Sequence, residues 1–388
     1  MKLLVVAGEA SADLHAGHLV ERLKTIEPVS LVGIGGDRLE AQGLVPLRHA
    51  RDMAVVGLTE ALKKIPQTLR LLTELEDLAR REKPAAALLL DLPDFNLRLA
   101  PRLKRLGIPV IYYISPQVWA WRSRRVYAMA DCIDLLLSIL PFERDWYRSH
   151  APEGLRVEYV GHPVLEEIPN QPYEPAPHRI AILPGSRESE WRNLFGPMVG
   201  AAALLARSEP ELEFVIPLAE PLRGNAFVRE ALSPDGPNGD ALAALGSRLR
   251  VVETAAHEVL RHARAAWIAS GTATLEAGVV GVPMVVAYKV SAVTAFLFRH
   301  VVRYTGAVAM VNLIHGGLGS AERAVPEVLQ DDVTPENLAS ALREVLREPR
   351  WSAMRDQLAR TRALLQGEGL PVENAARAVA GFLEGRGA

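Results

Sequence analysis

The sequence predicts an α/β protein with two doubly wound domains, each a parallel sheet covered by helices on both faces. Short, nearly continuous apolar runs alternate with segments of helical periodicity, which is typical of buried parallel strands. The alternation is interrupted by the Pro-rich stretch 170–178 (NQPYEPAPH) and then resumes. A length of 388 residues also favours two domains over one.

We expect a Rossmann-like domain over residues 1–168, a linker over 169–178, a second Rossmann-like domain over 179–350, and helices over 351–388. These last helices cross back to the first domain or to a partner subunit. In such sheets the loops after the strands meet in a crevice. Most polar clusters of the sequence follow strand ends, so we expect the two domains to face a cleft.

The expected strands are the apolar runs of the chain, and from residue 334 onward the pattern is helical. In the first domain they are 3–7, 29–34, 85–90, 110–114, 135–139 and 157–160. In the second domain they are 179–183, 212–217, 249–252, 265–269 and 284–288.

Composition excludes several classes of protein. Hydrophobic residues make up 49% and charged residues 23% of the chain, as in ordinary globular proteins. The net charge of −2 gives no electrostatic case for nucleic-acid binding. The single cysteine, Cys132, excludes a disulfide framework and a cysteine metal cluster. The first apolar run is too short for a signal peptide, and none is long enough to span a membrane, so we expect a cytoplasmic protein.

The stretch 265–289 reads as a strand, a Ser270-Gly271-Thr272 turn, a helix and a second strand. A turn of this kind offers backbone N–H groups, hydroxyls and the positive end of a helix dipole, which suits a phosphate group. Glu276 lies one turn further on, where a carboxylate can accept hydrogen bonds from a ribose. The alternative is that Ser270 or Thr272 only caps the helix.

Nine segments occur together over most of the chain. They are GEASAD (8–13), GIGGDRLEAQG (33–43), DLPDFN (91–96), YYISPQVWAWR (112–122), LPFE (140–143), VGHPV (160–164), LPGSRESE (183–190), ASGTATLEAGVVGVPMVVAYK (269–289) and VNLI (311–314). With them the sequence resembles the lipid-A-disaccharide synthase family, inverting glycosyltransferases of the GT-B fold.

The resemblance implies transfer of 2,3-diacylglucosamine from UDP-2,3-diacylglucosamine to 2,3-diacylglucosamine 1-phosphate, with UDP as the second product. It also implies action at the cytoplasmic face of the inner membrane, without a cofactor, and allows for a homodimer. Two other functions stay open. One is a different UDP-sugar enzyme on the same fold, such as an epimerase or a soluble glycosyltransferase, and the other is an inactive membrane-binding relative.

An inverting transfer needs a base near the acceptor hydroxyl. Asp91 and Asp94 follow a buried strand, and the resemblance makes Asp94 the base. The alternative is that one of them caps the helix that begins near Phe95. The resemblance places Glu9 on the acceptor side of the cleft as a third catalytic candidate, beside Asp94 and Arg187. Ser11 and Asp13 share its loop.

The leaving diphosphate needs a positive partner. Arg187 follows Gly185 and Ser186 at a strand end, where a guanidinium can pair with phosphate oxygens. The alternative is a surface ion pair with Glu188 or Glu190. Because the donor half has no Asp-x-Asp pair at a strand end, we expect the arginine to act without a metal ion.

The resemblance adds further residues to the donor site. They are Ser270, Gly271, Thr272, Thr274, Glu276, Asn312, Glu327 and Gln330. The sequence leaves the roles of Ala12 and His162 open. The family has glycine where Ala12 stands, and Ala12 is strained if that position needs a positive φ. His162 either faces the donor or is satisfied by the backbone.

The stretch 55–78 carries apolar residues at helical spacing, among them Leu62, Ile65, Leu69 and Leu72, with basic residues alongside and Pro66 within. Pro66 predicts two short helices or a kinked one. The pattern suits an interfacial membrane segment or an ordinary amphipathic helix packed on the sheet. The acyl chains of the family's substrates favour the membrane, with 295–302 as a second candidate.

Overall fold

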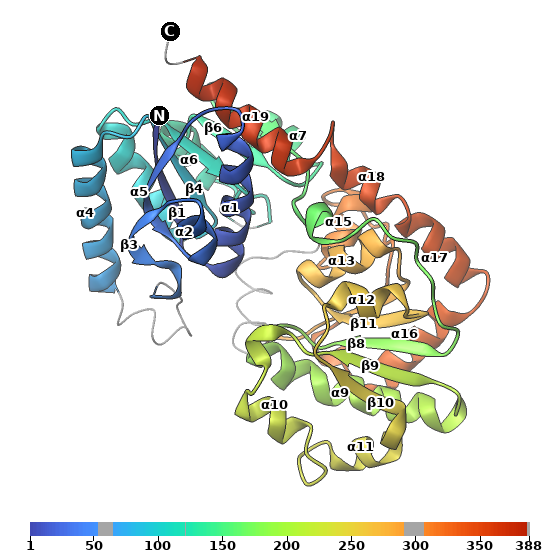
Figure 1. Ribbon diagram of the computed structural model, residues 1–388. Helices are drawn as coiled ribbons and strands as arrows, with labels where there is room; N and C mark the ends of the chain where they lie inside the picture. The colour runs from blue at the N-terminus through green and yellow to red at the C-terminus, as the bar shows by residue number, and fades with distance from the viewer. Residues whose placement is uncertain (53–64, 121, 291–305, 386–388) are drawn as a thin grey trace. The chain divides into compact units, whose positions relative to one another are not determined.

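The computed structural model describes residues 1–52, 65–120, 122–290 and 306–385, and the chain divides into two compact units. Unit 1 contains Met1–Pro163 and Leu365–Ala388, and unit 2 contains Val164–Leu364. Each unit has one all-parallel sheet with helices packed on it (Figure 1). The predicted α/β class with two Rossmann-like domains is confirmed.

The sheet of unit 1 has seven strands in the order β3-β2-β1-β4-β5-β6-β7. The strands are β1 (Lys2–Ala7), β2 (Ser30–Gly35), β3 (Val45–His49), β4 (Ala86–Leu90), β5 (Val110–Tyr113), β6 (Leu135–Ser138) and β7 (Arg156–Tyr159). Its helices are α1 (Ala10–Lys24), α2 (Asp37–Ala41), α4 (Ile65–Glu82), α5 (Pro93–Arg105), α6 (Arg125–Cys132), α7 (Glu143–His150) and α19 (Pro371–Glu384), with the short 3-10 helix η1 (Ala50–Asp52).

The sheet of unit 2 has six strands in the order β10-β9-β8-β11-β12-β13. The strands are β8 (Arg179–Leu183), β9 (Glu213–Pro217), β10 (Leu249–Val252), β11 (Ala265–Ala269), β12 (Met284–Tyr288) and β13 (Glu327–Leu329). The longer helices are α9 (Glu188–Ser208), α13 (Thr272–Val280), α16 (Pro335–Leu346) and α17 (Arg350–Leu358). The shorter ones are α8 (Val164–Glu167), α10 (Ala226–Ala231), α11 (Gly239–Leu245), α12 (Ala256–Arg261), α15 (Met310–Gly316), η2 (Glu220–Leu222), η3 (Gly246–Arg248) and η5 (Gln330–Asp332).

The end of the chain belongs to unit 1. The boundary between unit 2 and unit 1 falls within α18 (Thr361–Gln366), and α19 then packs along α1 (Figure 1). The backbone N–H of His162 donates to the Leu365 carbonyl at 3.0 Å, and Asn374 Nδ2 donates to the Val160 carbonyl at 3.2 Å. These bonds attach the last helix to the end of the unit 1 sheet.

The Pro-rich segment 169–178 lies within unit 2 and is bound to the rest of that unit. The N–H groups of Glu174 and Ala176 donate to the carbonyls of Arg261 and His262, and the Tyr173 hydroxyl donates to the Ala263 carbonyl at 2.7 Å. The chain therefore passes between the units before this segment, at Pro163–Val164, and again within α18.

Helix α4 explains how unit 1 covers one face of its sheet. It begins at Ile65, so Pro66 stands in its first turn, where a missing N–H costs nothing. Leu72, Leu75 and Ala79 share one face and are buried in the core of the unit. Among the described residues, no helix has the length and apolar content needed to cross a bilayer.

Candidate active site

The turns after β1 and β4 lie side by side in unit 1. These strands are neighbours, and the chain runs outward from β1 to β3 and then, from β4 to β7, in the other direction. Ligands of doubly wound sheets bind beside such a switch point, at the carboxyl ends of the strands. The structure thus brings the Glu9 turn next to the turn that carries Asp91 and Asp94.

The turn after β4 is held in a conformation that side chains rarely adopt. Asp91 and Leu92 have φ values of 49° and 43°, in the left-handed region. Buried side chains brace it: Asn96 Nδ2 donates to the Leu90 and Asp91 carbonyls at 3.0 and 2.7 Å, and the Tyr112 hydroxyl donates to the Asp91 carbonyl at 2.5 Å. Such bracing offsets the strain and fixes the start of α5.

Asp94 lies in the first turn of α5, and its side chain is 66% exposed. Arg125 Nη2 lies 2.6 Å from its Oδ1 atom, and Arg122 Nη1 lies 3.6 Å from the same atom. The helix has Leu92 at its N-cap without a side-chain cap bond, so neither aspartate fills the capping role that was the alternative. The carboxylate is therefore placed by arginines and remains accessible.

The loop after β1 supplies fewer candidate acceptor-binding residues than the sequence predicts. Glu9 stands at the N-cap of α1 and is exposed, as is Ser11, so both remain candidates for the acceptor side. Asp13 is a correction: it is buried, and its carboxylate accepts backbone N–H groups of Gly36, Arg38 and Leu39 at 2.6, 2.9 and 3.2 Å. It caps α2 instead of facing the acceptor.

Two other features of unit 1 were open in the sequence. Ala12 lies inside α1 without a positive φ, so the strain that was considered there does not arise. His162 is buried, and burial together with the nearby His15 lowers its pKa to about 3.

Unit 2 repeats the arrangement. Strands β8 and β11 are neighbours at its switch point, so the Gly185–Arg187 turn lies beside the Ser270–Thr272 turn. Separate sequence motifs predict that both turns bind the donor. The topology is what brings them together.

The turn after β8 is organised by Glu190. Its Oε2 atom accepts the backbone N–H groups of Ser186 and Arg187 at 2.8 and 3.2 Å, and its Oε1 atom pairs with the Arg187 guanidinium at 3.2 Å. The ion pair considered as the alternative is thus present. Because the Arg187 side chain is 75% exposed, this pair stabilises little and the arginine can exchange it for a ligand.

The turn after β11 leaves the start of α13 without a side-chain cap. Gly271 is the N-cap residue, and neither Ser270 nor Thr272 fills that role. Ser270 Oγ donates to the Val308 carbonyl at 2.9 Å instead. Thr274 is another correction, because it is buried and its hydroxyl donates to the Gly271 carbonyl at 2.8 Å. The first N–H groups of α13 and the exposed Thr272 remain for an anion.

Glu276 is half-buried one turn into α13. Burial, with a smaller contribution from the charge of Glu167, raises the pKa of its carboxyl group from 4.5 to about 7. A carboxylate that lacks water gains most from a hydroxyl donor, so this position suits a ribose.

Two expected donor residues have structural roles. Asn312 is buried, and its side chain exchanges hydrogen bonds with the Val325 backbone, both at 2.9 Å. Glu327 accepts the backbone N–H groups of Val308 and Ala309 and the Asn312 amide, and so holds the start of α15. These bonds give both side chains a structural role in unit 2. Gln330 is half-buried, and its Oε1 atom accepts the Val290 N–H at 3.4 Å.

The apolar stripe expected to face a membrane is only partly exposed. Leu72 is 1% exposed and packs in the core of unit 1, so its assignment to a membrane surface is wrong. Leu69 is 46% exposed. The side chain of Ile65 and the whole of Leu62, like the second candidate 295–302, lie outside what the structure describes.

Sequence reasoning missed the groups that support the unit 1 turn. Arg122 and Arg125 reach Asp94, and the buried Glu143 binds the loop that precedes them through Trp119. Two signals were present, the VWAWR and LPFE segments, but sequence spacing alone does not show that Trp119 pairs with Glu143, 24 positions on, or Arg125 with Asp94, 31 positions back.

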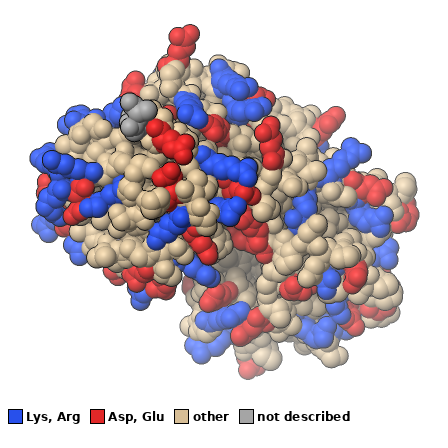
Figure 2. Space-filling view, turned by 45° about the horizontal axis from the view of Figure 1, so that its top comes forward, with Lys and Arg blue, Asp and Glu red and all other residues tan. Residues whose placement is uncertain are grey.

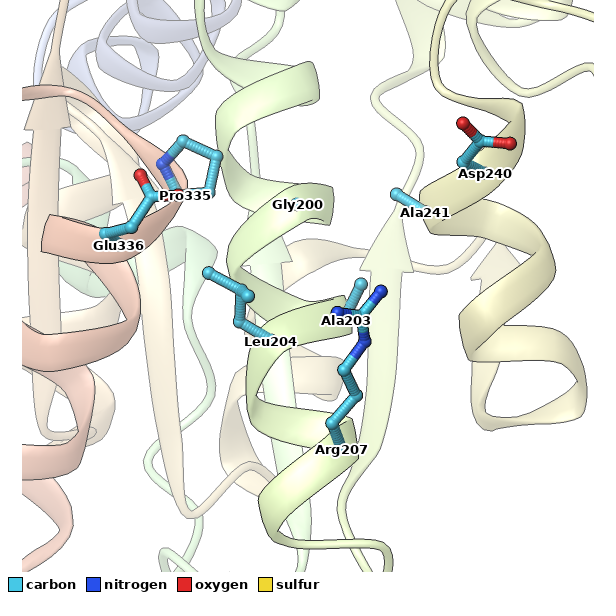
Figure 3. Close-up of a pocket in the computed structure, with 8 residues that line it drawn as sticks. All are labelled: Gly200, Ala203, Leu204, Arg207, Asp240, Ala241, Pro335 and Glu336. Atoms are coloured by element: carbon cyan, nitrogen blue, oxygen red, sulfur yellow. The ribbon is translucent and has the colours of Figure 1, made fainter.

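Other pockets and clusters are separate from these turns. A shallow pocket of about 240 Å³ lies between α9, α11 and α16, lined by residues such as Arg207 and Asp240 (Figure 3). Arg207 stands 20 residues beyond Arg187, about 30 Å along α9, so the pocket is remote from the turn after β8.

Asp37, Glu40 and His49 could bring three ligand atoms together. Arg51, however, donates to His49 Nδ1 at 2.9 Å and to Asp37 at 3.1 Å. This cation already compensates the acidic charge and engages the imidazole, which disfavours a metal ion there. On the face shown in Figure 2, acidic and basic side chains are interspersed, as the small net charge predicts.

The family model described as lipid-A-disaccharide synthetase matches residues 3–380. The chain belongs to the lipid-A-disaccharide synthase family. A lipid-A-disaccharide synthase of Anaeromyxobacter sp. (strain K) is 42% identical over 387 residues, 96% of this chain and 95% of the relative. That of Myxococcus xanthus is 42% identical over 355 residues, 89% and 88% of the two chains. The resemblance found in the sequence is confirmed, and the chain is a glycosyltransferase of lipid A biosynthesis.

Solved structures show the GT-B fold of this lipid-A-disaccharide synthase family member. A UDP-glucosyltransferase from Polygonum tinctorium matches with a TM-score of 0.63 and 13% identity over 99% of this chain and 98% of its own. The UDP-GlcNAc 2-epimerase of Neisseria meningitidis, bound to UDP-GlcNAc, matches with a TM-score of 0.59 and 14% identity over 99% and 100%. At such identities the likeness concerns the fold alone.

Proposed function

We propose that this enzyme transfers 2,3-diacylglucosamine from UDP-2,3-diacylglucosamine to 2,3-diacylglucosamine 1-phosphate, with inversion and without a metal ion. The observation that carries the proposal is that each unit places a chemically different turn at its switch point. Unit 1 presents an accessible carboxylate for the acceptor, and unit 2 presents an arginine and an uncapped helix start for the donor.

In the proposed step, Asp94 takes the proton of the acceptor's 6-hydroxyl as its oxygen attacks the anomeric carbon of the donor. The new bond is the β-1,6 glycosidic bond, and the bond from the anomeric carbon to the phosphate oxygen breaks. The electron pair of that bond leaves with UDP. Among the described residues, both arginine contacts of Asp94 use Oδ1, so Oδ2 can accept the proton.

On the donor side, Arg187 and the first N–H groups of α13 compensate the charge that develops on the leaving diphosphate. Arg187 exchanges its exposed pair with Glu190 for phosphate oxygens. Glu276 accepts hydrogen bonds from the ribose hydroxyls. These groups supply, without a metal ion, the positive charge and orientation that departure of UDP needs.

We further propose that the enzyme binds the cytoplasmic face of the inner membrane peripherally, because its substrates carry acyl chains. Leu69 on α4 and Val45 on the neighbouring edge strand β3 are exposed apolar side chains of unit 1. The Arg48–Glu74 ion pair at 3.2 Å joins this strand and helix. Each is an apolar side chain that can enter a lipid interface, and Leu69 is the one that belongs to the expected stripe.

The matched variants Leu69→Ser and Leu72→Ser test this surface. Leu69→Ser should weaken binding to anionic vesicles and leave the melting temperature nearly unchanged. Leu72→Ser should lower the free energy of unfolding by about 3–5 kcal/mol, because it leaves a cavity and a buried hydroxyl. Unchanged vesicle binding by Leu69→Ser would place the membrane contact elsewhere.

Mass spectrometry of the products tests the proposed reaction. Incubation with both substrates should give the tetraacyl disaccharide 1-phosphate and UDP in equal amounts. Epimerised donor or free diacylglucosamine without disaccharide would contradict the proposal.

A further inference from the structure

Two arginines converge on one oxygen of Asp94. Arg125 begins α6 and donates from Nη2 at 2.6 Å, and Arg122 stands three residues earlier with its Nη1 at 3.6 Å. The Arg125 side chain is 29% exposed, less than half the exposure of Asp94. Two guanidinium groups thus approach the same carboxylate oxygen at the accessible end of the turn.

The loop that presents these arginines is attached to the core by a buried carboxylate. Glu143 is 0% exposed, and its Oε1 atom accepts Trp119 Nε1–H at 2.9 Å. Its Oε2 atom accepts the backbone N–H groups of Ile139 and Leu140, both at 3.2 Å. Trp119 also packs edge-on against Phe142, with ring centroids 5.0 Å apart.

A second set of buried hydrogen bonds holds the start of the same loop. Ser115 Oγ donates to the Tyr147 hydroxyl at 2.8 Å, and that hydroxyl donates to the Pro116 carbonyl at 3.0 Å. Both contacts reach the loop from α7, the helix that also carries Glu143. A loop fixed in this way holds its cationic side chains with little loss of entropy on binding a ligand.

We propose that Arg122 and Arg125 bind the phosphate group of the acceptor. This inference rests on the proposed function, in which the acceptor carries both the reacting hydroxyl and a phosphate. Those two groups extend from opposite sides of the ring oxygen of one sugar. A cationic pair beside the carboxylate base therefore matches the charge pattern of that substrate.

The chemistry of the guanidinium group supports two simultaneous roles. It has five N–H donors, and Arg125 uses one end of this fork for Asp94. The remaining donors can bind phosphate oxygens with the bidentate geometry that arginine favours. The phosphate then binds these donors while Asp94 stays oriented toward the hydroxyl.

The test compares two acceptors that differ only in the phosphate, 2,3-diacylglucosamine 1-phosphate and 2,3-diacylglucosamine. For the wild type, kcat/KM should be roughly 10- to 100-fold higher with the phosphate. In Arg125→Gln and Arg122→Gln this ratio should fall to a few-fold. Arg125→Lys should recover part of it as a point charge. Arg105→Gln, about 16 Å from Asp94 along α5, is the matched control and should keep the wild-type ratio.

Equal losses on both acceptors, with the ratio unchanged, would overturn the proposal and limit the arginines to orienting Asp94. Calorimetry with glucosamine 1-phosphate and glucosamine gives the same comparison without turnover. If the wild type forms no disaccharide but prefers the phosphorylated sugar through Arg125, the phosphate site stands and the proposed transfer fails. If it shows no preference in either measurement, the phosphate site is wrong.

Discussion

The turns at the switch points of the two units have the same topology but offer different chemistry. In unit 1 the turn after β4 exposes a side chain, Asp94, and groups from other segments hold it in place. In unit 2 the turns after β8 and β11 rely on glycines and backbone N–H groups, and the cation, Arg187, belongs to the turn after β8 itself. A catalytic base is a single side chain that must be held in position by its neighbours. An anion site can instead be formed by a backbone conformation that points N–H groups at the ligand.

The comparison predicts that the largest effect comes from the side chain of unit 1. Asp94→Asn keeps the shape of the residue but removes the proton acceptor, so kcat should fall by about 100- to 10,000-fold. The melting temperature should stay close to that of the wild type because the side chain is largely exposed. Product formation and thermal unfolding of the purified variant check both statements, and near-normal turnover would exclude Asp94 as the base.

Loss of the cation in unit 2 should have the next largest effect. Arg187→Ala should weaken UDP binding and lower kcat/KM by roughly 10- to 100-fold, because charge-assisted bonds to the diphosphate are lost. A chelator should leave the activity of the wild type unchanged. Inhibition by chelator that magnesium or manganese reverses would show that a metal ion does the work assigned to Arg187.

The backbone shape of unit 2 can be tested at Gly185. Its φ is +120°, and an added Cβ would lie 2.1 Å from Glu190 Oε2. Gly185→Ala should lower the free energy of unfolding by about 1–3 kcal/mol and weaken UDP binding roughly 10-fold. Gly224→Ala is the control, since its φ is +71° with nothing within 4 Å of the added atom. Equal UDP affinity in both variants would argue against a shaped anion site.

The smallest predicted effect is a pH dependence from Glu276. Its pKa of about 7 lies above the ordinary 4.5, so its contribution to stability is fully present below pH 4.5 and is lost as the pH rises through 7. UDP binding should change in the opposite direction, a few-fold tighter above pH 7, because the charged carboxylate is the better acceptor. Glu276→Gln should remove the trend in melting temperature between about pH 5 and 8. It should reduce the trend in UDP affinity to the part that comes from ionisation of the terminal phosphate of UDP.

Much of the fold could be predicted from the sequence, because buried parallel strands have continuous apolar runs. The strands that were missed, β3 and β13, are short edge strands. They have partly exposed residues and no continuous apolar run. The sequence could predict site residues where a charged side chain directly follows a strand, as at Asp94 and Arg187. The site prediction is wrong where a buried polar residue braces the backbone, as at Asp13 and Thr274, because the sequence pattern does not show which backbone groups need a partner.

The most direct test of the comparison is a titration of UDP into wild-type enzyme, Asp94→Asn and Arg187→Ala. The account predicts that Asp94→Asn binds UDP within about twofold of the wild type, although its turnover is lost. Arg187→Ala should bind UDP roughly 10-fold or more weakly. Equal weakening of UDP binding in both variants would contradict the division of roles between the two turns.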